Sequence, residues 1–205
     1  GGDEVVIYVM EDYSIVETKI SHEMDAVKIA YTIVELAKQW EVPHIGIDSI
    51  GLGHPICDHV KKLYRKPFYI NSSETSVYSE MFNNLRTEMW WNVRLGFLDK
   101  KIPFPEDYEL RRQLKAVRYS LTGSPERVKL EKKDATKKRL GNSPDRADAF
   151  AYGCWVTNIV EKTPELREES DKIGLGKYKP LFTTTALFEA PRESGRLKQI
   201  LLQGV

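Results

Sequence analysis

One stretch of the chain decides the fold: His44-Ile45-Gly46-Ile47-Asp48-Ser49-Ile50-Gly51-Leu52-Gly53. Its first half is typical of a short buried strand, and its second half is typical of a glycine turn. Asp48 therefore ends a strand directly before a turn, which is where open α/β sheets bind their ligands. The alternative is an aspartate that only forms the turn or caps a helix, and this stretch alone does not separate the two.

The sequence before and after this stretch alternates strands with helices. Residues 5–10 and 14–20 are β-rich and predict an antiparallel hairpin. Asp25 is a candidate N-cap of a helix whose apolar spacing continues to Trp40, a second helix follows the glycine turn, and residues 68–70 predict another strand. The order β-β-α-β-α-β indicates an α/β protein with a mixed sheet, in which an antiparallel hairpin is followed by βαβ units with helices on both faces.

The rest of the chain adds helices, one more hairpin and a weakly patterned end. Apolar spacing predicts a helix over residues 79–95, a shorter one over 109–114 and a long one from 144 to about 160. Weak alternation over 115–121 and 127–130 suggests an edge hairpin. Periodicity fades beyond residue 163. We therefore expect one domain over residues 1–162 and a C-terminal tail or docking segment over residues 163–205.

Two further acids lie in the run Ser143-Pro144-Asp145-Arg146-Ala147-Asp148-Ala149. This run is typical of a first helical turn, because serine is a good N-cap and proline fits the first helical position. The helix dipole alone would account for Asp145. It does not account for Asp148, which borders an apolar face where a carboxylate is costly unless it is paired or metal-bound.

Together, Asp48, Asp145 and Asp148 predict a site for divalent cations. Side chains three apart on a helix share a face, and hard cations prefer oxygen ligands. Paired Mg²⁺ or Mn²⁺ ions catalyse in-line attack on phosphodiesters. The residues thus indicate a metal-dependent nuclease with two divalent metal ions as cofactors.

Composition narrows the class of protein but does not identify its binding partner. The net charge of +1 hides basic clusters that would suit a phosphate backbone. No P-loop, zinc-ligand spacing or membrane-spanning apolar run occurs in the sequence, and the two cysteines are expected to be reduced core residues. The candidate DNA-binding residues are Lys132, Lys133, Lys137, Lys138, Arg139, Arg146 and Arg86.

Three segments in this order resemble the C-terminal nuclease domain of the large terminase subunit of tailed bacteriophages, which has an RNase H-like fold. They are residues 46–53, residues 84–91 (Asn-Leu-Arg-Thr-Glu-Met-Trp-Trp) and residues 138–149, the last being the most specific. By this resemblance, Asp48 matches the second metal-binding acid, Asp148 matches the acid on the last helix, and Asp145 matches a nearby position that helps at the site. The family's first acid lies on an opening strand before a turn like Gly2-Asp3, so we expect that ligand to lie outside this chain, with impaired metal affinity and activity if the chain is truncated.

The resemblance also implies a biological setting. The domain would cut concatemeric double-stranded viral DNA during genome packaging in the host-cell cytoplasm. Its partners would be an upstream ATPase domain of the same subunit, the small terminase subunit and the portal or procapsid, with no membrane involved. The alternatives are another RNase H-like nuclease, such as a junction resolvase or a transposase core, and a non-catalytic DNA-binding packaging module.

Overall fold

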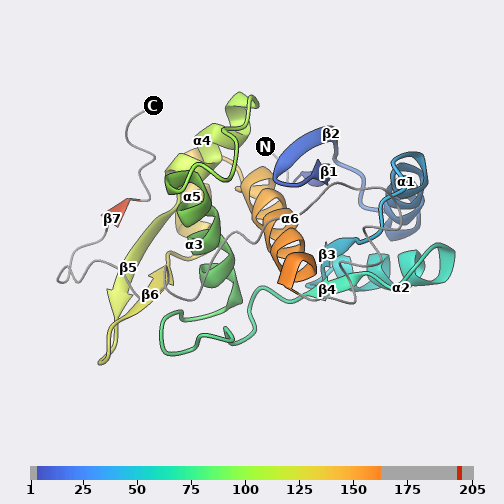
Figure 1. Cartoon of the computed structure of the whole chain (residues 1–205). Helices are drawn as coiled ribbons and strands as arrows, with labels where there is room; N and C mark the ends of the chain where they lie inside the picture. Colours follow the sequence, from blue (N-terminus) through green and yellow to red (C-terminus); the bar gives the residue numbers. More distant parts are fainter. Residues whose placement is uncertain (1–3, 163–197, 200–205) are drawn as a thin grey trace.

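The computed structural model describes residues 4–162 and the pair 198–199, and it confirms the predicted alternation of strands and helices. Figure 1 shows the elements in chain order. They are β1 (Val5–Glu11), β2 (Ser14–Ser21), α1 (Ala26–Gln39), β3 (Gly46–Asp48), α2 (Gly53–Leu63), β4 (Phe68–Ile70), α3 (Leu85–Leu98), α4 (Tyr108–Ala116), β5 (Arg118–Thr122), β6 (Arg127–Leu130), α5 (Lys133–Leu140), α6 (Asp145–Lys162) and β7 (Lys198–Gln199).

The strands pair in both directions, as the sequence predicts. β1 and β2 form an antiparallel hairpin with a bulge between Val9 and Met10. β3 and β4 are parallel and are connected by α2, because parallel neighbours need a crossover. β5 pairs antiparallel with both β6 and β7. The α/β class with a mixed strand arrangement is therefore confirmed.

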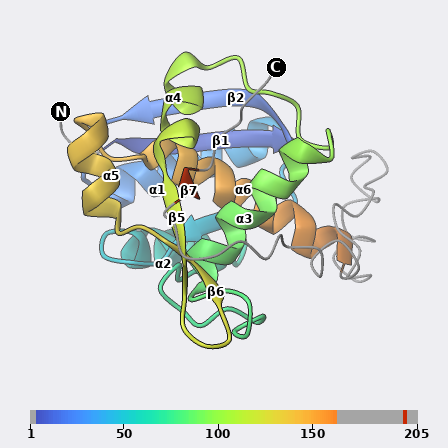
Figure 2. The same cartoon turned by 90° about the vertical axis from the view of Figure 1, so that its left-hand side faces the viewer.

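Helix α6 is the central element of the molecule. It contacts α3 and α4 on one side and β1 and β3 on the other, an arrangement that can be followed in Figures 1 and 2. A helix in this position must be apolar on several faces, and Ala147, Phe150, Ala151 and Cys154 are all buried. The acids in the first turn of α6 are thereby carried by the helix that contacts both groups of elements.

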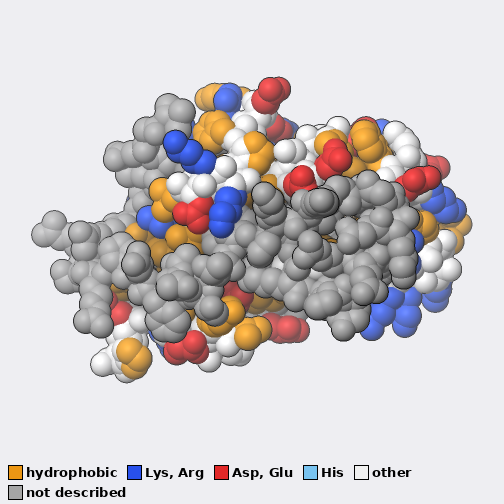
Figure 3. Space-filling model, in the orientation of Figure 1, with side chains coloured by type: hydrophobic (Ala, Val, Ile, Leu, Met, Phe, Trp, Pro, Cys, Tyr) orange, Lys and Arg blue, Asp and Glu red, His pale blue; other side chains and the backbone are white. Residues whose placement is uncertain are grey.

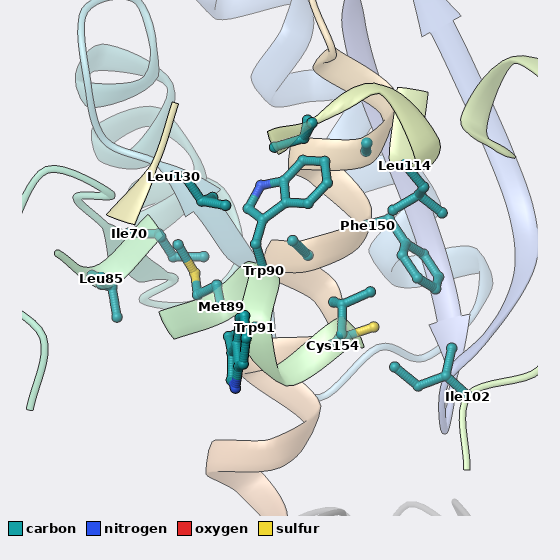
Figure 4. Packing of buried hydrophobic residues seen from close by; sticks show 14 of the residues in the cluster. Ile70, Leu85, Met89, Trp90, Trp91, Ile102, Leu114, Leu130, Phe150 and Cys154 are labelled. Carbon is teal, nitrogen blue, oxygen red and sulfur yellow. The ribbon is translucent and has the colours of Figure 1, made fainter. Parts of the chain in front are cut away.

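The main core lies between α3, α6 and the helices and strands around them (Figure 4). Trp90 and Phe150 are among its largest fully buried side chains. Trp91 is also buried, and its ring meets Tyr119 of β5 edge to face at 5.1 Å between centroids. A second cluster joins α1 to α2, and both cysteines are buried free thiols.

Two helices differ from their predictions for physical reasons. α3 begins at Leu85 and not at residue 79, because the Asn84 side chain accepts the Thr87 backbone N–H and caps the helix there. α5 was not predicted, because its residues are almost all polar or basic and give no apolar periodicity. It ends at Gly141, whose φ of 85° favours glycine.

The predicted tail, residues 163–205, lies outside the described residues apart from β7, so its role stays a prediction. No helix among the described residues has the length and hydropathy of a membrane span. On the face shown in Figure 3, Lys and Arg side chains gather near α2. Lys61 and Lys62 of α2 and Lys66 just after it are exposed.

Candidate active site

Asp48 is held at the end of β3 by the turn that follows it. Its Oδ1 accepts the Ile50 backbone N–H at 2.9 Å, and the Ser49 N–H extends the pairing with β4 by donating to the Ile70 carbonyl at 2.9 Å. The chain then reverses into α2, and a Cβ at Gly53 would overlap the Asp48 backbone oxygen. The glycine is therefore needed for the turn that places the Asp48 carboxylate.

Asp145 and Asp148 share one cation, the ammonium group of Lys133. The Lys133 Nζ lies 2.9 Å from Asp145 Oδ1 and 3.1 Å from Asp148 Oδ2. Lys133 is the first residue of α5, and the acids lie in the first turn of α6, so the connection between these helices brings the three together. The lysine ammonium thus lies between the two carboxylates that sequence reasoning assigned to a metal.

Asp148 is almost fully buried, with 4% of its surface exposed. Its Oδ1 accepts the Trp90 indole Nε1–H at 2.9 Å and the Arg86 Nε–H at 3.2 Å. The Arg86 Nη2 lies 3.1 Å from the same oxygen as an ion pair, outside hydrogen-bond geometry. The burial cost that the sequence anticipated for this acid is therefore offset by donors from α3.

The pKa values of Asp145 and Lys133 show whether burial or the neighbouring charges and hydrogen bonds dominate. Burial raises the pKa of Asp145, but the hydrogen bond from Ser143 and the Lys133 charge outweigh it and hold the pKa below its ordinary value. Burial also lowers the pKa of Lys133, but the two carboxylates outweigh it and raise the pKa. Asp145 and Lys133 are thus both charged at neutral pH, and they form an ion pair.

Asp48 and the other two acids line one cavity of about 400 Å³. Asp48, Lys133, Asp145 and Asp148 all line it, together with Tyr152 of α6. The Tyr152 hydroxyl donates to Asp48 Oδ2 at 3.2 Å, and Tyr152 lies one helical turn beyond Asp148. All three predicted acids therefore face one cavity, from the end of β3 and the start of α6.

The donor set suits a hard divalent cation. Within residues 4–162, no three Asp, Glu, His or Cys side chains are close enough to form a metal cage by themselves. However, Asp145 and Asp148 already hold one positive charge between them, and carboxylate oxygens are the ligands that Mg²⁺ and Mn²⁺ prefer. Asp48 offers a further carboxylate in the same cavity. Metal ligation by the three acids stays a prediction, with which these residues are compatible.

The predicted DNA-binding residues fall into two groups. Lys132, Lys133, Lys138 and Arg139 are exposed on or beside α5, and Lys137 of the same helix is partly buried. Arg86 and Arg146, in contrast, are used inside the protein: the Arg86 side chain is only 12% exposed against Asp148, and Arg146 bonds Glu4 and Asp107. Arg139 also pairs with Glu131. DNA binding by this set stays a prediction, and the exposed lysines are its best-placed members.

The start of α6 is fixed by a polar network around Glu109 of α4. Glu109 accepts two hydrogen bonds from Arg112, at 2.7 and 2.8 Å, and one each from Gln113 and Asn142 at 3.1 Å. The Gln113 side chain is fully buried and accepts the Ala147 backbone N–H at 3.1 Å. This network connects α4 to the turn of α6 that carries both acids.

The Glu109 network predicts a specific loss of stability in acid. Hydrogen bonds from Arg112 outweigh burial and lower the pKa of Glu109 from 4.5 to about 2. A carboxyl with a depressed pKa stabilises the fold above its unfolded pKa, so this contribution is present above pH 4.5 and is lost as the pH falls toward 2. At neutral pH, Glu109→Gln should lower the free energy of unfolding by about 1.5 kcal/mol.

Urea unfolding at several pH values tests this expectation. Glu109→Gln should flatten the pH dependence between pH 4.5 and 2, whereas Glu106→Gln, at an exposed acid outside the network, should keep it. An unchanged acid limb in Glu109→Gln would contradict the assignment.

Removing Lys133 is expected to favour metal binding. The Lys133→Ala variant should bind Mn²⁺ about tenfold more tightly, because the carboxylates lose a competing cation. Isothermal calorimetry measures the affinity, and Lys132→Ala is the control, since Lys132 is the preceding exposed lysine. Weaker Mn²⁺ binding by Lys133→Ala would show that the ammonium does not occupy the cation position.

Several residues of this site were not assigned to it from sequence. The sequence assigned Lys133 to DNA binding, and it assigned neither Trp90 nor Tyr152 to this site. The spacing of Arg86 and Trp90, four apart and thus on one helical face, was the available signal. Nothing local could have paired them with Asp148, 58 residues beyond Trp90.

Comparison with known proteins supports the fold. No family model and no curated protein matches the chain. The nuclease domain of the large terminase subunit gp2 of bacterial virus Sf6 matches with a TM-score of 0.61 and 16% identity, over 74% of this chain and 81% of that chain. A mutant of gp2c from the same terminase subunit with calcium matches with a TM-score of 0.60 and 16% identity, over 74% and 82%. This chain therefore shares the fold of that nuclease domain.

Proposed function

We propose that this protein is a divalent-metal-dependent endonuclease that cuts double-stranded viral DNA during genome packaging. The observation that carries the proposal is the cavity that Asp48, Asp145 and Asp148 all line, in which the Lys133 ammonium lies between the last two. The fold similarity adds support, because one structure of the Sf6 nuclease domain, a mutant, contains manganese and another mutant structure contains calcium.

The chain's own residues would prepare the site for two Mg²⁺ or Mn²⁺ ions. When bound, the ions would activate a water molecule and stabilise the leaving 3′ oxygen. Asp48, Asp145 and Asp148 would hold them. Lys133, with 45% of its side chain exposed, keeps the carboxylates in place and can move into solvent without repacking of the core.

The exposed lysines beside the site would hold the duplex. Lys132 directly precedes α5, Lys133 and Lys138 belong to it, all three are exposed, and Lys133 reaches the acids. Contacts of this kind neutralise phosphates and carry no sequence information, so we expect weak sequence preference and strong salt dependence. In the packaging complex, an ATPase domain, the small terminase subunit and the portal would then determine where cutting occurs in the host cytoplasm.

Cleavage of supercoiled plasmid DNA tests the proposal. We expect nicked and linear products with Mn²⁺ or Mg²⁺ and none with EDTA. A branched junction and an RNA–DNA hybrid, offered in competition, separate a terminase-like nuclease from a resolvase or an RNase H. DNA binding without cleavage under any metal condition would support the non-catalytic packaging module instead.

A further inference from the structure

The two oxygens of Asp148 have different surroundings. Oδ1 faces α3 and accepts hydrogen bonds from Trp90 Nε1 at 2.9 Å and from Arg86 Nε at 3.2 Å. Oδ2 faces α5, where the Lys133 Nζ lies 3.1 Å away. The hydrogen-bond donors of Trp90 and Arg86 thus converge on Oδ1, and the Lys133 ammonium lies beside Oδ2.

The donors on Oδ1 are themselves immobilised. Trp90 is 2% exposed, and the Arg86 guanidinium lies over its ring at 5.6 Å from the centroid. The two residues are four apart on α3, so they share one face. A buried indole N–H needs an acceptor, and Asp148 supplies it. Rotating the carboxylate would break both bonds of this buried side chain, which fixes its orientation.

We propose that Trp90 and Arg86 are positioning residues that hold Asp148 by Oδ1 and so present Oδ2 to the catalytic cation. This inference rests on the proposed nuclease function and assigns a role to two residues that do not touch the reacting atoms. Carboxylate ligands of metal ions are commonly oriented by hydrogen bonds of this kind, and losing one typically costs about 10–100-fold in metal affinity or activity.

The neighbouring tryptophan provides a matched control. Trp91 is also buried, 5% exposed, but its ring packs on Tyr119, and Arg94 lies 4.8 Å from its centroid. Figure 4 shows the two indole rings pointing to different sides of α3. Replacing either by phenylalanine removes similar core volume, but only Trp90→Phe removes a hydrogen bond to Asp148.

Mn²⁺ binding without DNA is the primary measurement. By calorimetry, Trp90→Phe should raise the Mn²⁺ dissociation constant about 10–100-fold. The Mn²⁺ concentration for half-maximal plasmid cleavage should rise by the same factor. Trp91→Phe should match wild type in both. Arg86→Gln, which also loses donors to Oδ1, should shift the affinity in the same direction and serves if Trp90→Phe does not fold.

The indole N–H resonance of Trp90 gives a readout independent of cleavage. In ¹⁵N spectra, this resonance should move on Mg²⁺ addition and in Asp148→Asn, while that of Trp40, at the C-terminal end of α1 and outside the lining of the cavity, should not. If wild type neither binds metal nor cuts DNA, the proposed function fails. If wild type does both and Trp90→Phe binds Mn²⁺ as tightly as Trp91→Phe, the positioning role is overturned.

Discussion

Asp148→Asn is expected to reduce metal-dependent plasmid cleavage at least about a hundredfold, because metal ions supply several kcal/mol of transition-state stabilisation and each 1.4 kcal/mol is a tenfold change in rate. The amide retains the shape of the side chain and an oxygen that can still accept from Trp90 and Arg86. It removes the charge that binds Lys133, and by proposal the metal ion, through Oδ2. The variant should therefore fold and fail to cut.

Initial nicking rates at saturating Mn²⁺ give the measurement, with thermal unfolding as the check on folding. Asp134→Asn, at an exposed acid of α5, is the control for lost negative charge near the site. Asp148→Ala should additionally destabilise the protein by about 3–5 kcal/mol, because the Arg86 guanidinium would be left buried without its anion. A folded Asp148→Asn that cuts at the wild-type rate would remove Asp148 from the mechanism.

Gly53→Ala is expected to destabilise the fold and to disturb Asp48. The added Cβ would overlap the Asp48 backbone oxygen, which cannot move aside as a flexible side chain would. The turn must open instead, at a cost of about 3 kcal/mol or more for an overpacked position. Because the same turn holds the Asp48 carboxylate through the Ile50 N–H, cleavage should fall as well.

Gly51→Ala separates this effect from ordinary glycine strain. Gly51 has φ 58° but nothing within 4 Å of an added Cβ, so alanine there should cost only about 1–2 kcal/mol. Urea unfolding measures both variants, and Mn²⁺ calorimetry reports the site. Equal destabilisation by the two substitutions would show that the contact with Asp48 is not decisive.

Local sequence patterns were sufficient for much of the fold. Strand β4 occupies the predicted residues, and the Asp25 cap begins α1 as expected, with its side chain accepting two backbone N–H groups. Such features depend on neighbours within a few residues, which the sequence displays directly. The start of α3 was placed too early, because the capping amide of Asn84 is a weaker signal than the apolar residues before it.

The α5 helix shows the limit of periodicity. Its only buried residue is Thr136, so its sequence has no apolar stripe from which a helix could be predicted. In the structure, Thr136 and Arg139 bond Glu131, and Lys133 bonds the two acids of α6. The helix is held by polar contacts with other segments, and these contacts exist only once the chain has folded.

The candidate site also has some features that the sequence determines and others that only the folded structure determines. From the sequence alone came the acids and their types of position: Asp48 at a strand end, and Asp145 with Asp148 on one face of a helical turn, because strand and helix geometry is local. Only the tertiary structure decided how Asp148 is held, since its partners Trp90 and Lys133 come from α3 and α5. The physical reason is that burying a carboxylate requires donors, and packing, not proximity in the sequence, selects which donors reach it.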